Sequence, residues 1–146
     1  MKQKDAFKKA GSVLFVCYLN SIRSPMAEGL LKKLAGDTIF VQSCGTSKGE
    51  TDPLMVAVMK ERDIDMAYHQ PKSLADIPDR SFDVVIAFTD DAGEAAKAAF
   101  QGQDTLIEVW PTPDPTSGSL DVRAMMNNYR SICTMLERRL KERFLT

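Results

Sequence analysis

The chain has 146 residues, of which 44% are hydrophobic and 27% are charged, and it therefore has the size and composition of one compact α/β domain. Its 19 basic and 20 acidic residues are mixed along the sequence and leave a formal net charge of −1. This balance predicts no surface for nucleic acid or for a membrane, so selectivity is expected to come from a site. We expect residues 1–146 to form a single domain in which residues 1–10 are mobile.

The cysteine and histidine content excludes further classes of protein. Three cysteines without a CxxC pair, together with a single histidine, predict neither a disulfide framework nor a zinc site. The apolar run at 12–19 follows several lysines but lacks the cleavage site of a signal peptide, and no later segment is long enough to span a membrane. We therefore expect a cytoplasmic protein that needs no metal and no cofactor.

The hydrophobic pattern predicts strands that alternate with helices. Apolar β-rich runs lie at residues 13–17, 38–43, 82–88 and 105–110. Helical patterns cover residues 25–35 with Ser24 as N-cap, the segment after Asp52 and Pro53, residues 91–100 and residues 120–144. This alternation predicts a three-layer α/β/α fold around a four-stranded parallel sheet of flavodoxin-like order 2-1-3-4.

Chemistry-bearing residues follow several of these strands. In open parallel sheets the ligand binds beyond the carboxyl ends of the strands. Cys17 ends the first predicted strand, Asp90 and Asp91 follow the third, and the proline-rich segment 111–118 follows the fourth. We expect these segments to meet at one rim of the sheet.

The stretch between Cys17 and Arg23 has the features of an oxyanion site. A loop of five residues before a helix can turn its backbone N–H groups inward, and the helix N-terminus adds its positive dipole end. Arg23 supplies a planar fork for two oxygens. A cysteine in such surroundings is held as the nucleophilic thiolate. Taken alone, C-x5-R arises by chance, and a buried cysteine is the commoner case.

Five segments together resemble the low-molecular-weight protein tyrosine phosphatase superfamily, which includes the thioredoxin-coupled arsenate reductases. In chain order they are VLFVCYLNSIRSPMAEG at 13–29, QSCGT at 42–46, IDMAYHQPKSL at 64–74, FDVVIAFTDDA at 82–92 and PDP at 113–115. The resemblance implies a phosphatase in which Cys17 attacks phosphorus to form a cysteinyl-phosphate. It also implies that Arg23 binds the equatorial oxygens and that Asp114 protonates the leaving group and then activates water.

The resemblance implies further roles around the loop. The phosphate-binding positions are Tyr18, Leu19, Asn20, Ser21, Ile22, Arg23 and Ser24. Asn20, Ser24, Ser43 and His69 match positions that hold the loop in shape, with Asn20 in a left-handed conformation and Ser24 assisting the thiolate. Asp90 and Asp91 are the rival acids, although capping of the next helix is their expected role.

The chain departs from the family pattern at several positions. Leu19 stands where Gly is usual, which predicts a distorted nest or a narrowed entrance, and Ile22 replaces a frequent second Cys. Thr116 and Ser117 follow Asp-Pro in place of aromatic residues, so Tyr18 or Trp110 is expected to supply the aromatic wall.

Three functional readings therefore stay open. A phosphatase acting on a phosphorylated protein or a small phosphate ester leads, because it needs only Cys17, Arg23 and Asp114. An arsenate reductase would need an external thiol, since neither Cys44 nor Cys133 is placed for a relay. A catalytically impaired binder of oxyanions or phosphoproteins is the third reading. The sequence decides neither the natural substrate nor the oligomeric state.

Overall fold

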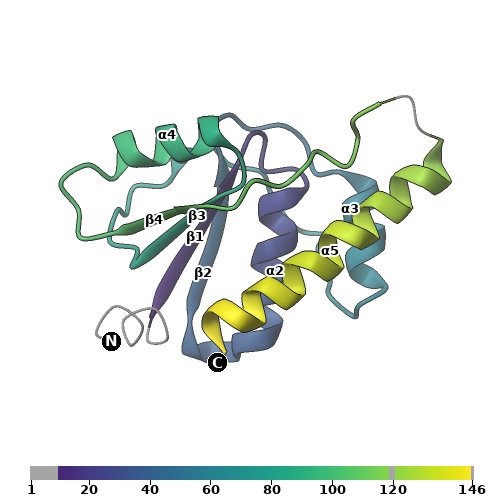
Figure 1. The fold of residues 1–146 in the computed structure, drawn as a ribbon, viewed down its shortest axis with the longest axis horizontal. Helices are drawn as coiled ribbons and strands as arrows, with labels where there is room; N and C mark the ends of the chain where they lie inside the picture. The colour runs from purple at the N-terminus through teal and green to yellow at the C-terminus, as the bar shows by residue number, and fades with distance from the viewer. Residues whose placement is uncertain (1–9, 119–120, 146) are drawn as a thin grey trace.

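The structure, a computed structural model, describes residues 10–118 and 121–145 (Figure 1). The predicted mobility of residues 1–10 falls almost wholly on residues 1–9, which lie outside the described part. The strands are β1 (Ser12–Cys17), β2 (Phe40–Gly45), β3 (Val84–Ala87) and β4 (Leu106–Val109). The helices are α2 (Arg23–Ala35), α3 (Pro53–Lys60), α4 (Asp90–Ala99) and α5 (Val122–Phe144), with short 3-10 turns at Gly36–Thr38 and Leu74–Asp76.

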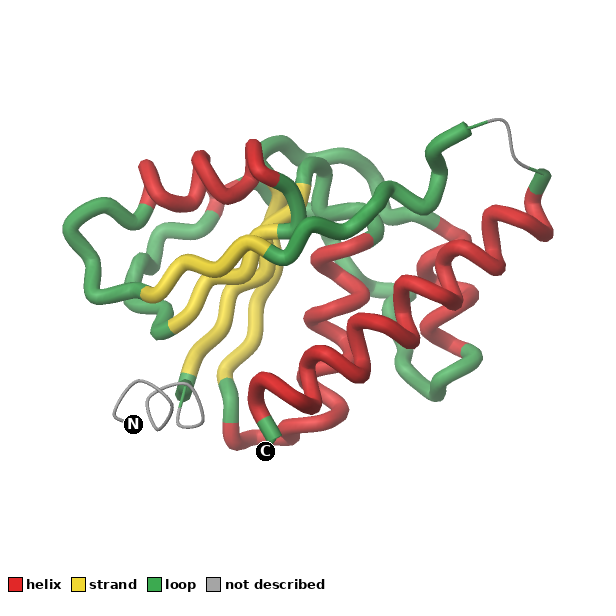
Figure 2. Tube along the Cα trace, viewed as in Figure 1, coloured by secondary structure: helices red, strands yellow, loops and turns green. Residues whose placement is uncertain are grey.

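The predicted sheet is confirmed. All strand pairs are parallel and the order is β2-β1-β3-β4. Figure 2 shows α4 on one face of the sheet and the other long helices on the opposite face, which makes three layers. The carboxyl ends of the strands all point to the same edge, where the connecting loops converge (Figure 1).

Two apolar clusters hold the layers together. Alternate residues of β1 point to opposite faces, so Val13 and Phe15 pack towards α2 and α5 while Leu14 and Val16 pack towards α4. These strand residues are fully buried, as near-continuous apolar runs in a parallel sheet should be. Within the described ranges, no helix is long and apolar enough to cross a membrane.

The N-cap predicted from the sequence is confirmed for α3 and is wrong for α2 and α4. Asp52 caps α3 as predicted, because its carboxylate accepts from the backbone N–H groups of Leu54 and Met55. Ser24 is not the N-cap of α2: the helix begins at Arg23, and the Ser24 hydroxyl is used inside the loop described below. Before α4 the cap is Thr89, so the prediction that Asp90 and Asp91 cap this helix is wrong; they stand in its first turn.

Candidate active site

A small pocket opens at the carboxyl end of β1. Its volume is about 350 Å³. Its walls come from residues 17–19 and 21–23 of the loop after β1, from Glu50 and Asp52 before α3, and from Asp114 and Thr116 after β4. Cys17, Arg23 and Asp114, which the sequence analysis selected, therefore face one cavity although they lie far apart in the chain. Asp90 and Asp91 do not line it.

Asn20 organises the loop. Its backbone is left-handed, with φ 56°, a conformation that asparagine tolerates better than most residues. Its side-chain Nδ2 donates to Ser24 Oγ and to Ser43 Oγ, both at 2.9 Å, and its Oδ1 accepts from the backbone N–H of Lys72 at 3.0 Å. Its carbonyl oxygen lies 2.9 Å from Nε2 of His69. The side chain and the carbonyl of one buried residue thus tie the loop to two other segments.

Leu19 does not force a strained backbone. In the part of the chain that the structure describes, only Asn20 and Asp63 are non-glycine residues with positive φ. The leucine side chain lies on the pocket wall and packs over Gly49, where an added Cβ would come within 3.2 Å of Leu19 Cβ. The absent side chain of Gly49 therefore makes room for the leucine without a positive φ at Leu19, and a distorted nest or a narrowed entrance stays a prediction.

Cys17 is almost completely buried at the base of the pocket. Its Sγ lies 2.9 Å from Ser24 Oγ, which also lies within hydrogen-bond distance of the Cys44 carbonyl oxygen, at 3.2 Å. Cys44 and Cys133 are buried away from the pocket, and burial raises the pKa of the Cys44 thiol to about 12, with the nearby Cys17 adding to the effect. Burial likewise raises the pKa of Cys133. Neither thiol is available as a partner for Cys17.

Arg23 and Asp114 connect the two loops that form the pocket. Arg23 donates through one guanidinium nitrogen to the carbonyl oxygen of Thr112 at 2.9 Å, two residues before Asp114. Asp114 Oδ1 accepts from the backbone N–H and the hydroxyl of Thr116, at 2.9 and 2.7 Å. Partial burial alone would raise the pKa of Asp114, but the two Thr116 hydrogen bonds and the Arg23 charge together bring this pKa below its usual value.

The pocket wall carries one cation and three carboxylates. Arg23 faces Glu50, Asp52 and Asp114 across the cavity. Asp52 is also engaged by the hydroxyl of Tyr129 at 2.9 Å, whereas Glu50 is exposed at the rim. An oxyanion on the loop would neutralise Arg23 and leave an acidic rim, which disfavours further negative charge next to that oxyanion. The pocket therefore has room for one tetrahedral oxyanion against the Cys17 sulfur, with the Arg23 guanidinium and the Asp114 carboxyl group beside it.

Comparison with known proteins identifies this architecture. Residues 12–145 match the family of the low molecular weight phosphotyrosine protein phosphatases. The chain belongs to this family.

The relatives of this family member include arsenate reductases. It is 34% identical over 110 residues to the glutaredoxin arsenate reductase of Synechocystis sp., a match that covers 75% of this chain and 82% of the relative. Arsenate reductase 2 of Staphylococcus saprophyticus is 34% identical over 83 residues, which are 57% of this chain and 63% of that protein. The structure of an arsenate reductase in the phosphate binding state is 29% identical, has a TM-score of 0.75 and covers 90% of this chain and 94% of its own.

The aromatic wall expected in this phosphatase-family pocket comes from one of the two predicted residues. Tyr18 lines the pocket and is 58% exposed. The prediction named Tyr18 or Trp110, and of the two Tyr18 lines the pocket, since the Trp110 side chain is buried against Phe88 and beneath the Arg139 guanidinium. Trp110 therefore belongs to the core, and Tyr18 is the aromatic residue on the pocket wall.

Sequence reasoning missed one residue of the loop support. Glu28 is 8% exposed, and its carboxylate accepts from Ser43 Oγ at 2.5 Å and from Lys32 Nζ at 2.6 Å. A glutamate in an amphipathic helix is ordinarily expected to face solvent, so the helical pattern did not predict that Glu28 is buried. The only available signal was its place inside the segment RSPMAEG, which carries the family resemblance.

Proposed function

We propose that this chain is a cysteine-dependent phosphomonoester phosphatase of the phosphotyrosine type. The observation that carries the proposal is the convergence of Cys17, Arg23 and Asp114 on one small pocket at the carboxyl end of β1. Family membership supports an enzyme of phosphatase or arsenate reductase type. The Tyr18 ring beside the pocket favours an aryl ester as the substrate.

The first chemical step transfers the phosphoryl group to sulfur. The Cys17 thiolate attacks phosphorus, the phosphorus–oxygen bond to the leaving group breaks, and Asp114 gives its proton to the departing oxygen. Arg23 and the backbone N–H groups of the loop hold the equatorial oxygens throughout. Asp114 favours its ionised form in the free protein, but a doubly negative phosphoryl group bound beside it favours the protonated form that the step requires.

The second step regenerates the enzyme. Asp114, now a carboxylate, takes a proton from a water molecule, the water oxygen attacks phosphorus, and the sulfur–phosphorus bond breaks to release inorganic phosphate. The Ser24 hydroxyl, 2.9 Å from the sulfur, stabilises the thiolate as it leaves.

Arsenate reduction is the second candidate, and the similarity to the Synechocystis glutaredoxin arsenate reductase favours it. In this reaction the Cys17 thiolate attacks arsenic and one arsenate oxygen leaves as water. An external thiolate then attacks the Cys17 sulfur, and the sulfur–arsenic bond breaks with its electron pair going to arsenic. Arsenic is thereby reduced and leaves as arsenite, and the two sulfurs are oxidised to a mixed disulfide. The external thiol is needed because Cys44 and Cys133 are buried away from the pocket. Free thiols at all three cysteines accord with a reducing compartment, and a cytoplasmic location is part of the proposal.

One comparison separates the candidates. The hydrolysis rate of an aryl phosphate is measured beside arsenate reduction with thioredoxin, glutaredoxin and small thiols as reductants. The proposal expects steady-state hydrolysis that is lost in Cys17→Ser, while phosphate binding remains measurable because the loop and Arg23 are intact. Reduction of arsenate without hydrolysis would replace the proposal with the second candidate. Phosphate binding without either reaction would leave an oxyanion binder.

A further inference from the structure

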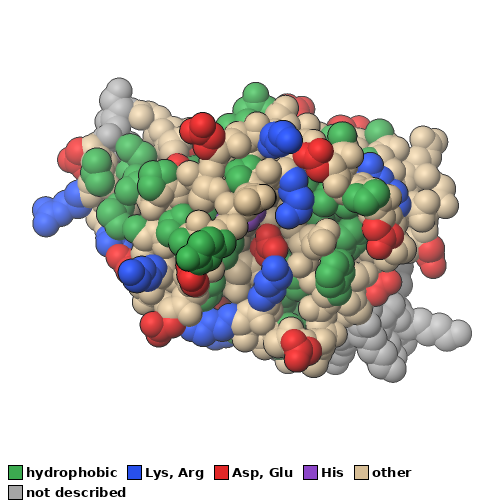
Figure 3. Space-filling view, turned by 180° about the vertical axis from the view of Figure 1, so that it is seen from behind, with side chains coloured by type: hydrophobic (Ala, Val, Ile, Leu, Met, Phe, Trp, Pro, Cys, Tyr) green, Lys and Arg blue, Asp and Glu red, His purple; other side chains and the backbone are tan. Residues whose placement is uncertain are grey.

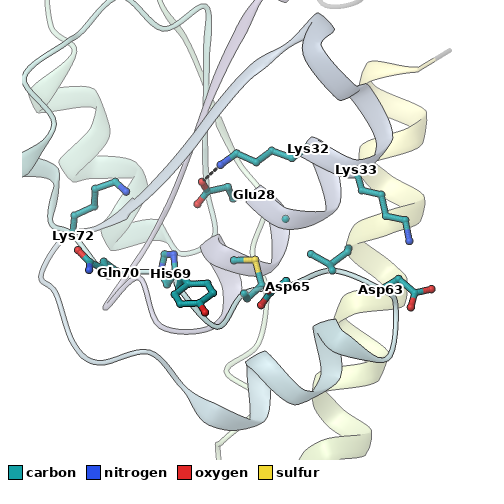
Figure 4. Close-up of a pocket in the computed structure, with 12 residues that line it drawn as sticks. Glu28, Lys32, Lys33, Asp63, Asp65, His69, Gln70 and Lys72 are labelled. Carbon is teal, nitrogen blue, oxygen red and sulfur yellow. Dashed lines mark hydrogen bonds and ion pairs between the residues drawn. The ribbon is translucent and has the colours of Figure 1, made fainter.

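A continuous chain of polar contacts joins a surface lysine to the catalytic sulfur. The contacts are Lys32 Nζ to Glu28 Oε2 (2.6 Å), Ser43 Oγ to Glu28 Oε1 (2.5 Å), Asn20 Nδ2 to Ser43 Oγ (2.9 Å), Asn20 Nδ2 to Ser24 Oγ (2.9 Å) and Ser24 Oγ to Cys17 Sγ (2.9 Å). Glu28 and Lys32 lie on the wall of a second pocket, of about 720 Å³, which does not include Cys17 (Figure 4).

The directions of the hydrogen bonds that Asn20 makes, and of the bond from Ser43 to Glu28, are determined. The backbone N–H of Lys72 can only donate, so the Asn20 oxygen faces it and the Asn20 NH₂ group faces the two serines. The NH₂ group can only donate, so Ser43 accepts from it and has its single proton left for Glu28. Ser43 therefore donates to Glu28, whose Oε1 is the acceptor of this bond.

Lys32 holds the other carboxylate oxygen of Glu28. An ammonium group has three donors and no acceptor, so the ion pair stabilises Glu28 in the form that accepts from Ser43. At the opposite end, Ser24 accepts from Asn20 and has one proton left, which either Cys17 Sγ or the Cys44 carbonyl can take. A thiolate accepts only, so this polarity favours a hydrogen bond from Ser24 to the thiolate.

We propose that Glu28 is a positioning residue for the nucleophile and that Lys32, through its ion pair with Glu28, fixes the direction of the hydrogen bonds that stabilise the Cys17 thiolate. Other charged or titratable groups on the wall around Glu28 are Lys33, Asp63, Asp65, Tyr68, His69 and Lys72 (Figure 4). Lys33 Nζ does not bond to Glu28 but donates to the carbonyl oxygen of Arg62. His69, the single histidine, shows only a small part of its surface in the space-filling view (Figure 3). Lys32 is therefore the cation bonded to the Glu28 carboxylate. The proposal rests on Cys17 being the nucleophile and not on which oxyanion it attacks.

The test compares Glu28→Gln and Lys32→Met with the adjacent-lysine control Lys33→Met. Glutamine has the shape of glutamate, but its NH₂ group must face either the Lys32 ammonium or Ser43, and both are unfavourable. The measurement is the rate of iodoacetamide alkylation of the Cys17 peptide against pH, read by mass spectrometry. Cys17 lines the active-site pocket and is reached through it, whereas Cys44 and Cys133 are completely buried and do not line that pocket, so they are not expected to react in the folded protein.

Loss of one net hydrogen bond to the thiolate, about 1 kcal/mol, corresponds to about a fivefold change. We expect the midpoint of the Glu28→Gln alkylation curve to move to higher pH, so that alkylation is about fivefold slower at pH values below the midpoint, with a fall in kcat and little change in KM. Lys32→Met is expected to move the curve the same way by a smaller amount, and Lys33→Met to leave it unchanged.

A folded Glu28→Gln protein with the wild-type alkylation curve would overturn the proposal, as would equal curves for Lys32→Met and Lys33→Met. Folding is checked by circular dichroism. If Glu28→Gln does not fold, the comparison of the two lysine variants decides, because Lys32 has a side chain 55% exposed and tolerates substitution. Alkylation needs no substrate, so this outcome is independent of whether the chain hydrolyses phosphate esters.

Discussion

Asn20 offers a test of how the oxyanion loop is held, because its backbone and its side chain make separable contributions. Replacing Asn20 by glycine keeps the left-handed backbone at no steric cost but deletes three side-chain hydrogen bonds, those with Ser24, Ser43 and the Lys72 N–H. At about 1 kcal/mol each, the loss is about 3 kcal/mol. Replacing it by alanine deletes the same bonds and adds about 1 kcal/mol for the left-handed conformation of a residue with a Cβ.

The assay is urea unfolding of the two variants, followed by circular dichroism and compared with the parent chain. We expect free energies of unfolding lowered by about 3 kcal/mol for Asn20→Gly and by about 4 kcal/mol for Asn20→Ala. Both changes are large against a typical total of about 5–15 kcal/mol. A glycine variant within about 0.5 kcal/mol of the parent, the range of an ordinary surface substitution, would refute the role of the side chain. An alanine variant more stable than the glycine variant would refute the role of the backbone.

Three further outcomes follow from the pocket. Asp114→Asn should slow hydrolysis by about 10²–10⁴-fold for esters with poor leaving groups and much less for nitrophenyl phosphate, and a loss independent of the leaving group would reject Asp114 as the acid. Thr116→Val removes a side-chain hydrogen bond that lowers the pKa of Asp114, so this pKa should rise. Because Asp114 must be protonated to act as the acid, the alkaline limb of the plot of kcat against pH should move to higher pH. A limb that moves to lower pH would contradict the assignment. Because burial raises the pKa of Cys44 to about 12, iodoacetamide at pH 8 should label Cys17 alone in the folded protein, and labelling of Cys44 at a comparable rate would show that the thiol is not buried as described.

The sequence was sufficient for the arrangement of the sheet because the signals for it are local. Runs such as residues 13–17 are apolar on both faces, which only a strand covered on both sides can be, and the alternation with helices then restricts the topology. The predicted strand boundaries were less accurate where a local interaction competes with strand formation. The second strand begins at Phe40 rather than at residue 38, because the chain continues from α2 into a 3-10 turn in which the Thr38 hydroxyl bonds to the Ala35 carbonyl.

The candidate site was predictable where residue type determines the chemistry, as for Cys17 and Arg23. It was not predictable where tertiary neighbours decide. Ser24 has the residue type of an N-cap, yet its hydroxyl is drawn into the loop by Asn20 and Cys17. Glu28 is buried in contact with Ser43 of β2, and Trp110 is covered by Arg139 of α5. Contacts between segments distant in sequence leave no trace in local patterns.

The central claim is that Cys17 becomes covalently phosphorylated during turnover. It is tested most directly by quenching the enzyme in acid during hydrolysis of an aryl phosphate and mapping the peptides by mass spectrometry. We expect a phosphate adduct on the peptide that contains Cys17, which accumulates further in Asp114→Ala because the base for the attacking water is missing. Steady hydrolysis with no adduct on Cys17 in either protein would contradict the account.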